Sequence, residues 1–244
     1  MKLTSFVCIG NTNGKHDKLS LPPGDVLIHT GGYTTCWVPA HIKTKKEAQL
    51  LQPEPPDDII KWMSDQPFKT KLMVPAFRDV ANLEDLTHYR AKFERAGIEL
   101  GVLECMTIKG IGVGCYNYWH KHWRTPLPCP NNELLIDTTK TLRNDCLSSI
   151  GVPYGLDILI TNPITVAESI TYNTDLDANI QSHHDILFNL VPTIYLFSGA
   201  ETGNNLPSKI LDTTCYNTSV WYRGQQVPEV VQFYIAAGGA YGRN

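Results

Sequence analysis

The first half of the chain alternates short apolar runs with stretches in which apolar residues recur at helical spacing. A short run of mostly apolar residues is typical of a buried strand, whereas spacing of three and four residues is typical of an amphipathic helix. Glycine closes the longer helical stretch and interrupts the last strand region. The pattern predicts strands over 3–9, 25–30, 71–74 and 102–114, and helices over 57–65 and 83–96.

The second half continues in the same way. We predict strands over 156–161, 193–197, 209–216 and 227–235, and helices over 137–150 and 178–190. Because strands and helices interleave, the sequence predicts an α/β fold, and 244 residues suffice for one large domain or two small ones. Functional loops are then expected at the carboxyl ends of the strands.

Composition removes several classes of partner. The 244 residues are 42% hydrophobic and 18% charged with a net charge of −3, so no basic footprint for nucleic acid is present. No apolar stretch has the length of a membrane span. Seven widely spaced cysteines without a C-x-x-C pair are typical of free thiols in a reducing compartment. We expect a soluble cytoplasmic protein that binds neither nucleic acid nor membrane; its oligomeric state is not predicted.

Sharp turns follow three early strands. The segment 6–17 (FVCIGNTNGKHD) runs from a strand into a tight loop, 25–34 (DVLIHTGGYT) ends in two glycines, and 74–79 (VPAFRD) follows the third strand. Three later segments follow the same order: 157–163 (DILITNP), 195–203 (YLFSGAETG) and 213–219 (TTCYNTS). In content and order these six segments resemble the motifs of the calcineurin-like metallophosphoesterases, in particular their small eukaryotic and bacterial branch.

The resemblance implies the family fold in a single domain spanning 1–244, in which two packed mixed β-sheets are flanked by helices in a four-layer sandwich. It also marks the positions at which the family binds metal, and here these positions have changed. Asparagine stands at both ligand positions of the first loop, and glycine replaces the bridging aspartate of the second. The substituted positions are Asn11, Asn13, Gly32, Phe77, Arg78, Asn162, Gly199 and Glu201.

Two-metal phosphoester hydrolysis needs anionic or imidazole donors for both cations. Glu201 is the one anionic substitute among the changed positions, so we predict a degenerate member without metal, cofactor or ordinary phosphodiesterase activity. A new metal site is an alternative, because His120 and His122 would point the same way in a strand. No third ligand follows at a recognisable spacing.

The altered cleft has the character of a site for a small organic ligand, which is the partner we predict. Arg78 would hold an anionic oxygen, Glu201 would act as a general base, and Tyr33 completes the catalytic set of a metal-independent cyclase or isomerase. Amide, aromatic and imidazole side chains would bind the ligand. These predicted binding residues are Asn11, Asn13, Phe77, Asn162, Tyr118, Trp119, His120 and His122.

A structural role is the alternative for each of these residues. Asn11 and Asn13 would satisfy the loop backbone, Tyr33 and Phe77 would fill space, and Arg78 would form an ion pair with a nearby carboxylate. Two alternative functions also stay open at this point. One is a pseudoenzyme that serves as a protein-interaction or structural module, and the other is a residual metal-dependent phosphodiesterase.

Overall fold

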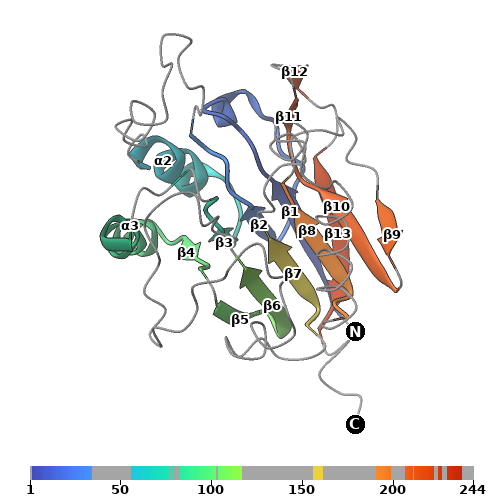
Figure 1. Ribbon diagram of the computed structural model, residues 1–244. Coiled ribbons are helices and arrows are strands. Elements are labelled where there is room, and N and C mark those ends of the chain that lie inside the picture. The colour runs from blue at the N-terminus through green and yellow to red at the C-terminus, as the bar shows by residue number, and fades with distance from the viewer. Residues whose placement is uncertain are drawn as a thin grey trace, which may run out of the picture.

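The computed structural model describes residues 2–34, 56–76, 79, 83–102, 104–116, 156–161, 191–198, 207–210, 212–222, 225–226 and 230–237. Their strands form two sheets and a two-stranded ribbon (Figure 1). The first sheet has the order β13-β1-β2-β3-β4, in which β1 to β4 are parallel and β13 is antiparallel to β1. Its strands are β1 (Leu3–Ile9), β2 (Val26–His29), β3 (Thr70–Met73), β4 (Glu99–Leu100) and β13 (Val231–Ala236).

The second sheet has the order β5-β6-β7-β8-β10-β9 and is also mixed. Its central strands β6, β7, β8 and β10 are parallel, while both edge strands pair antiparallel to their neighbours. Its strands are β5 (Glu104–Ile108), β6 (Ile111–Tyr116), β7 (Ile158–Thr161), β8 (Ile194–Phe197), β9 (Ser208–Ile210) and β10 (Thr213–Asn217). The ribbon pairs β11 (Trp221–Tyr222) with β12 (Gln225–Gln226).

Strand β1 shows why the sheets pack as they do. Successive side chains of a strand point to opposite faces. Phe6 and Cys8 therefore face the second sheet, whereas Val7 and Ile9 face the helices, and all four side chains are fully buried. The Phe6 ring stacks on Phe233 with ring centroids 5.4 Å apart, so aromatic packing joins β1 to β13 within the inter-sheet core.

Helices cover the other face of the first sheet. Figure 1 shows α2 (Asp57–Asp65) and α3 (Leu83–Arg95) together on that side, and the short 3-10 helix η1 (His16–Lys18) contacts α2. Ile59 and Met63 lie one turn apart on α2 and are both buried. They pack with Leu27, Met73 and other apolar residues of the sheet, which forms a second core.

The α/β class and the two packed mixed sheets confirm the predicted fold. Leu159 and Tyr195 face away from the inter-sheet core and are nevertheless buried, as the outer layer of a four-layer sandwich requires. The predicted helices 137–150 and 178–190 lie outside the described residues. The organisation as one domain over 1–244 stays a prediction.

Most predicted strand and helix bounds agree with the structure to within two residues. Lys109 and Gly110 have φ of 52° and 78°, so the glycine-marked break is a two-residue hairpin turn between β5 and β6. The single strand predicted over 209–216 was wrong: it is the hairpin of β9 and β10, in which Ile210 pairs with Thr213. That turn contains no glycine, so the pattern of residues did not reveal it.

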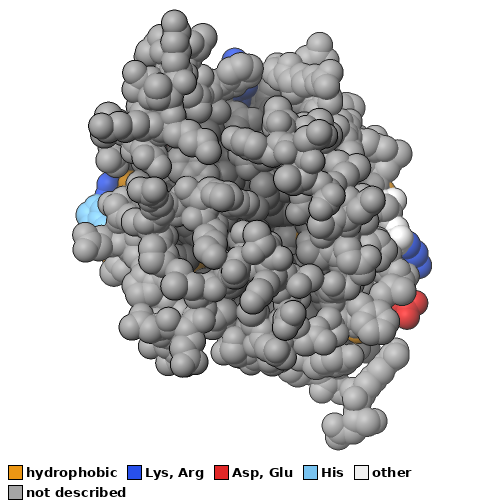
Figure 2. Space-filling model, in the orientation of Figure 1, with side chains coloured by type: hydrophobic (Ala, Val, Ile, Leu, Met, Phe, Trp, Pro, Cys, Tyr) orange, Lys and Arg blue, Asp and Glu red, His pale blue; other side chains and the backbone are white. Residues whose placement is uncertain are grey.

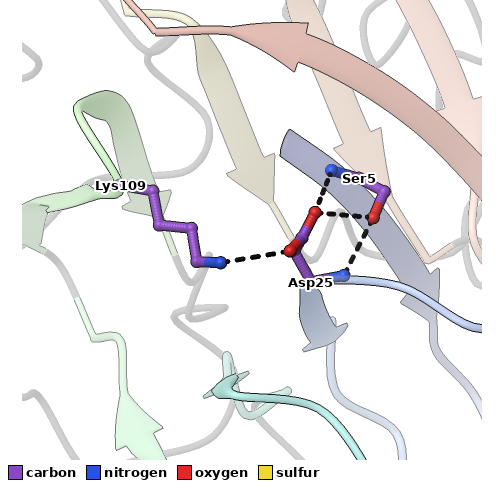
Figure 3. Close-up of polar contacts among 3 residues, drawn as sticks. All are labelled: Ser5, Asp25 and Lys109. Atoms are coloured by element: carbon purple, nitrogen blue, oxygen red, sulfur yellow. Dashed lines mark hydrogen bonds and ion pairs between the residues drawn. The ribbon is translucent and has the colours of Figure 1, made fainter. Parts of the chain in front are cut away.

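Matching aspartates begin a central parallel strand in each sheet. Asp25 precedes β2, and its carboxylate accepts the Ser5 N–H at 3.0 Å while its own N–H donates to the Ser5 carbonyl at 3.1 Å. Asp157 precedes β7 and makes the same pair of bonds with Gly112, at 2.8 and 3.1 Å. Lys109 adds an ion pair to Asp25 at 3.3 Å (Figure 3). The hydrogen bonds from Ser5 and the nearby Lys109 lower the pKa of Asp25 to about 2.

The described surface adds two plain observations. On the face drawn in Figure 2, described charged side chains are visible only near the margins, and they form no patch there. None of the helices in the described part of the chain combines the length and the apolar character needed to cross a bilayer.

Candidate functional site

Three loops meet where the parallel strands β1, β2 and β3 end. They are residues 10–14, residues 30–34, and residues 74–76 together with Asp79. Since the three strands are neighbours and run in one direction, their carboxyl ends lie at the same edge of the sheet. The second sheet reaches the same place, because Ser219 bridges to Gly10 just beyond the ends of β10 and β1.

The loop after β1 continues the parallel pairing with the loop after β2. The N–H groups of Asn11, Asn13 and Gly14 donate to the carbonyls of residues 31–33 at 2.8, 3.0 and 2.7 Å. Asn11 and Asn13 both have φ of 47°, a left-handed conformation that asparagine tolerates better than most residues. The Asn13 side-chain amide also donates to the Asn11 carbonyl at 3.1 Å. Both asparagines therefore organise the loop backbone.

The Asn11 side chain fills the space beside residue 32. Asn11 is buried, and its Nδ2 donates to the Ser219 hydroxyl at 3.0 Å. Its Oδ1 lies so close to Gly32 that a Cβ built on Gly32 would overlap it. Gly32 has φ of 74°, which also disfavours any other residue. Position 32 thus has room for no side chain while Asn11 keeps this orientation.

Asp79 is the buried carboxylate of the site. It is fully buried and accepts hydrogen bonds from the N–H groups of Gly32, Tyr33 and Thr34 at 2.6, 3.1 and 3.2 Å. The Thr34 hydroxyl donates to it at 3.1 Å, and the Ala76 N–H donates at 2.8 Å. One carboxylate therefore joins the loop after β2 to the loop after β3.

Tyr33 belongs to the loop after β2, and its side chain packs in the core on the helix side of the first sheet. Its side chain is buried, and its hydroxyl donates to the backbone carbonyl of Asp79 at 3.0 Å. Burial is the main cause that raises the pKa of Tyr33 above its ordinary value, and the nearby Asp79 and Tyr89 add to it. The phenol therefore stays protonated at neutral pH. The predicted catalytic role of Tyr33 stays a prediction, and its geometry is that of a packing and hydrogen-bonding residue.

His29 is a second buried polar group at the end of β2. Its Nδ1 accepts the Gly31 N–H at 3.1 Å, so the ring proton is assigned to Nε2, which lies 3.2 Å from the Thr12 hydroxyl. Burial lowers the pKa of His29 to about 3, and the nearby His16 contributes in the same direction. The imidazole is therefore neutral at neutral pH and links the first two loops.

A seam of hydroxyl groups connects the two sheets behind these loops. The hydroxyls of Thr30 and Thr218 lie 2.7 Å apart, and the Ser198 hydroxyl donates to the Thr30 carbonyl at 3.2 Å. Gly10 lies against all three: a Cβ there would overlap the Thr30 hydroxyl and come within 2.8 Å of the Ser198 Cβ. The edge is thus closely packed where the sheets meet.

Comparison with known proteins agrees with this architecture. No family model matches the chain. The "Metallophosphoesterase domain-containing protein 1" of Homo sapiens and that of Mus musculus are each 30% identical to it over 71 residues. This stretch is 29% of the chain and 18% of each relative, so the match spans about a fifth of the length of these relatives.

A solved structure resembles the chain over a much greater length. The phosphopantetheinyl hydrolase PptH from Mycobacterium tuberculosis superposes with a TM-score of 0.51 and covers 89% of both chains at 10% identity. The chain is metallophosphoesterase-like. This relationship confirms the resemblance found in the motifs, and at 10% identity the solved structure supports the fold alone.

The metallophosphoesterase family implies a pair of metal ions at this strand edge, and the described residues do not fit them. Asn11 directs an amide nitrogen to Ser219, Asn13 binds loop backbone, and Gly32 lacks a side chain and the space for one. The oxygens of Asp79 face backbone N–H groups. Within the described ranges, no three His, Cys, Asp or Glu side chains lie together as a metal site would require.

The structure brings three of the predicted site residues together: Asn11, Asn13 and Tyr33 lie on the two adjoining loops. Sequence reasoning missed Asp79 and His29 as organisers of the site. Asp79 stands in the third motif, which was its available signal, whereas a histidine within an apolar run gave none. The other predicted residues lie outside the described residues: Phe77, Arg78, Tyr118, Trp119, His120, His122, Asn162 and Glu201.

Proposed function

We propose that this metallophosphoesterase-like protein is non-hydrolytic and metal-independent, and that the loops at its strand edge bind a small organic molecule. The observation that carries this proposal is the contact between Asn11 and Gly32. The Asn11 amide lies where a side chain of residue 32 would begin, so position 32 offers no donor to a bridging cation. Two-metal hydrolysis cannot be derived from this arrangement.

The chemistry of the edge suits an organic ligand held by orientation. Asn13 is half-buried on the loop after β1, and amide side chains both donate and accept hydrogen bonds. The buried neutral His29 and the protonated Tyr33 bring no charge to the described part of the edge. Small-molecule sites typically combine apolar walls with a few fixed polar groups. The predicted binding residues outside the described ranges keep this role in the proposal.

The catalytic form of the proposal is a metal-independent isomerase or cyclase. Glu201 would take a proton from one carbon of the ligand and return it to another, while the guanidinium of Arg78 stabilises the enolate oxygen that forms in between. Arg78→Ala and Glu201→Gln should then each abolish turnover of the ligand while leaving the thermal unfolding curve unchanged. Full turnover in both variants would reject this assignment.

Native mass spectrometry of the purified protein tests the binding proposal directly. After dialysis against a chelator, the protein should retain a non-covalently bound organic mass. Asn13→Leu should reduce the bound fraction, because it removes the half-buried amide and enlarges the side chain. Asp212→Ala, in the exposed β9–β10 turn at the far end of β10, is the matched control and should bind as the wild type does.

A protein without any bound mass, whose melting temperature responds to no fraction of a metabolite extract, would contradict the proposal. That result would favour the protein-interaction alternative.

A further inference from the structure

The hydrogen-bond donors around Asp79 point inward to one place. Gly32, Tyr33 and Thr34 contribute three successive N–H groups, and the Thr34 hydroxyl reaches the same Oδ1 as two of them. Ala76, on the loop after the next strand, donates to Oδ2, as does the N–H of Gly32. Successive N–H groups that converge in this way form a concave binding place for an anion.

The cradle supports a second layer of contacts. While the N–H groups of residues 32–34 turn toward Asp79, the carbonyls of residues 31–33 turn away and accept the N–H groups of the loop 11–14. The peptide units between residues 31 and 34 therefore connect the Asp79 carboxylate on one side to Asn11 and Asn13 on the other. Fixing Asp79 fixes both layers.

We propose that the loops after β2 and β3 form a preformed anion cradle that the chain fills with its own Asp79 carboxylate, and that Asp79 is the positioning residue of the candidate site. The cradle itself follows from the contacts alone. The statement that it positions a ligand site rests on the proposed function, because Asn11, Asn13 and Tyr33 lie on the loops that it holds.

The charge of the Asp79 carboxylate is the reason that its hydrogen bonds stabilise the two loops. Hydrogen bonds to a charged acceptor are stronger than neutral ones, and a buried N–H left without a partner is costly. Removing the carboxylate would strand four buried N–H groups at once. Asp157 is the internal comparison: it is also buried and ionisable, and it accepts the N–H of Gly112 at the opposite end of a parallel strand.

Chemical rescue tests the cradle. Asp79→Ala deletes the carboxylate and leaves a hole that matches formate. We expect the variant to lose at least about 5 °C in melting temperature and formate, at neutral pH, to restore most of the loss saturably. Sodium chloride at equal ionic strength should restore little. Asp157→Ala is the matched control, and formate should not stabilise it beyond the effect on the wild type.

Failure of formate to stabilise a folded Asp79→Ala protein would overturn the proposal, and so would equal rescue by chloride or equal rescue of Asp157→Ala.

A second variant serves if Asp79→Ala does not fold. Asp79→Asn keeps the shape and places an NH₂ group among the donors. Hydrogen exchange should then accelerate at least about tenfold at the amides of Gly32, Tyr33, Thr34 and Ala76, with β7 and β8 unchanged. Wild-type exchange rates at those four amides would overturn the proposal.

Ligand binding distinguishes a positioning role of Asp79 from a purely structural one. The bound organic mass in native mass spectrometry should fall in Asp79→Ala and return with formate. Retention of the full bound mass by Asp79→Ala would overturn the positioning role. A failure of the proposed function is distinguishable, because it would remove the bound mass from the wild type and leave the formate rescue of stability intact.

Discussion

The buried imidazole of His29 makes the free energy of unfolding depend on pH. Its pKa is about 3 in the folded protein and near 6.5 in an unfolded chain. Between these values the unfolded state binds a proton that the folded state does not, so the free energy of unfolding falls as the pH falls. The contribution of His29 is complete above about pH 6.5 and is lost progressively toward pH 3.

Denaturant unfolding measured between pH 7.5 and pH 4 checks this. The wild type should lose stability with a slope that His29→Gln lacks, a difference of about 1.4 kcal/mol per pH unit in the middle of the range. His88→Gln, at an exposed position on α3, is the matched control and should keep the wild-type slope. Equal slopes for the wild type and His29→Gln would show that His29 is not held neutral by burial.

At the scale of residues, the sequence predicted part of the site. Asn11 and Asn13 were recognised because they interrupt a motif, and their contacts with loop backbone agree with the structural role that was left open for them. The role of Asp79 was missed, because one aspartate after a strand does not reveal that four N–H groups will converge on it. Such convergence depends on two loops, after β2 and after β3, that the fold brings together.

At the scale of elements, Gly10 lies where the end of β1 packs against the second sheet. Gly10 has no left-handed φ, so its requirement is for space rather than for backbone conformation. Gly97, after α3, is the opposite case: its φ is 72°, and a Cβ there would meet nothing within 4 Å. Substitutions at Gly10 and Gly97 therefore distinguish a steric effect from a conformational one.

Gly10→Ala should lower the free energy of unfolding by about 2–3 kcal/mol, because the new methyl group overlaps the Thr30 hydroxyl. Gly97→Ala should cost about 1 kcal/mol, the amount typical of a left-handed residue in open space. Adding Thr30→Ala to Gly10→Ala should recover part of the loss, which a double-mutant cycle in urea measures. Strictly additive effects at positions 10 and 30 would contradict the steric explanation.

Elements were easier to predict than their partners. Buried parallel strands are continuous apolar runs, so β2, β7 and β8 could be found from pattern alone. The two residues of β4 were missed because they give too short a pattern. Pairing across the chain, such as β13 beside β1, depends on contacts between distant segments and came only from the structure.

At the scale of the whole molecule, the protein has the two sheets of a metallophosphoesterase-like fold. Hydrogen bonds between its own residues connect the described loops at the strand edge. The comparison with phosphopantetheinyl hydrolase covers most of both chains, so the similarity of fold extends well beyond the individual motifs. In the described loops, carboxylate–amide, imidazole–hydroxyl and hydroxyl–hydroxyl contacts connect the strands. We therefore expect the folded state and its melting temperature to be insensitive to chelators.

The central claim, that this scaffold no longer holds a pair of cations, is tested most directly by the manganese content of the purified protein. The protein is dialysed to equilibrium against excess Mn²⁺, and bound metal is then determined beside a hydrolytically active metallophosphoesterase. Our account predicts less than one tightly bound ion per chain and no metal-dependent hydrolysis of a generic phosphodiester. Two bound ions per chain, accompanied by such hydrolysis, would contradict it.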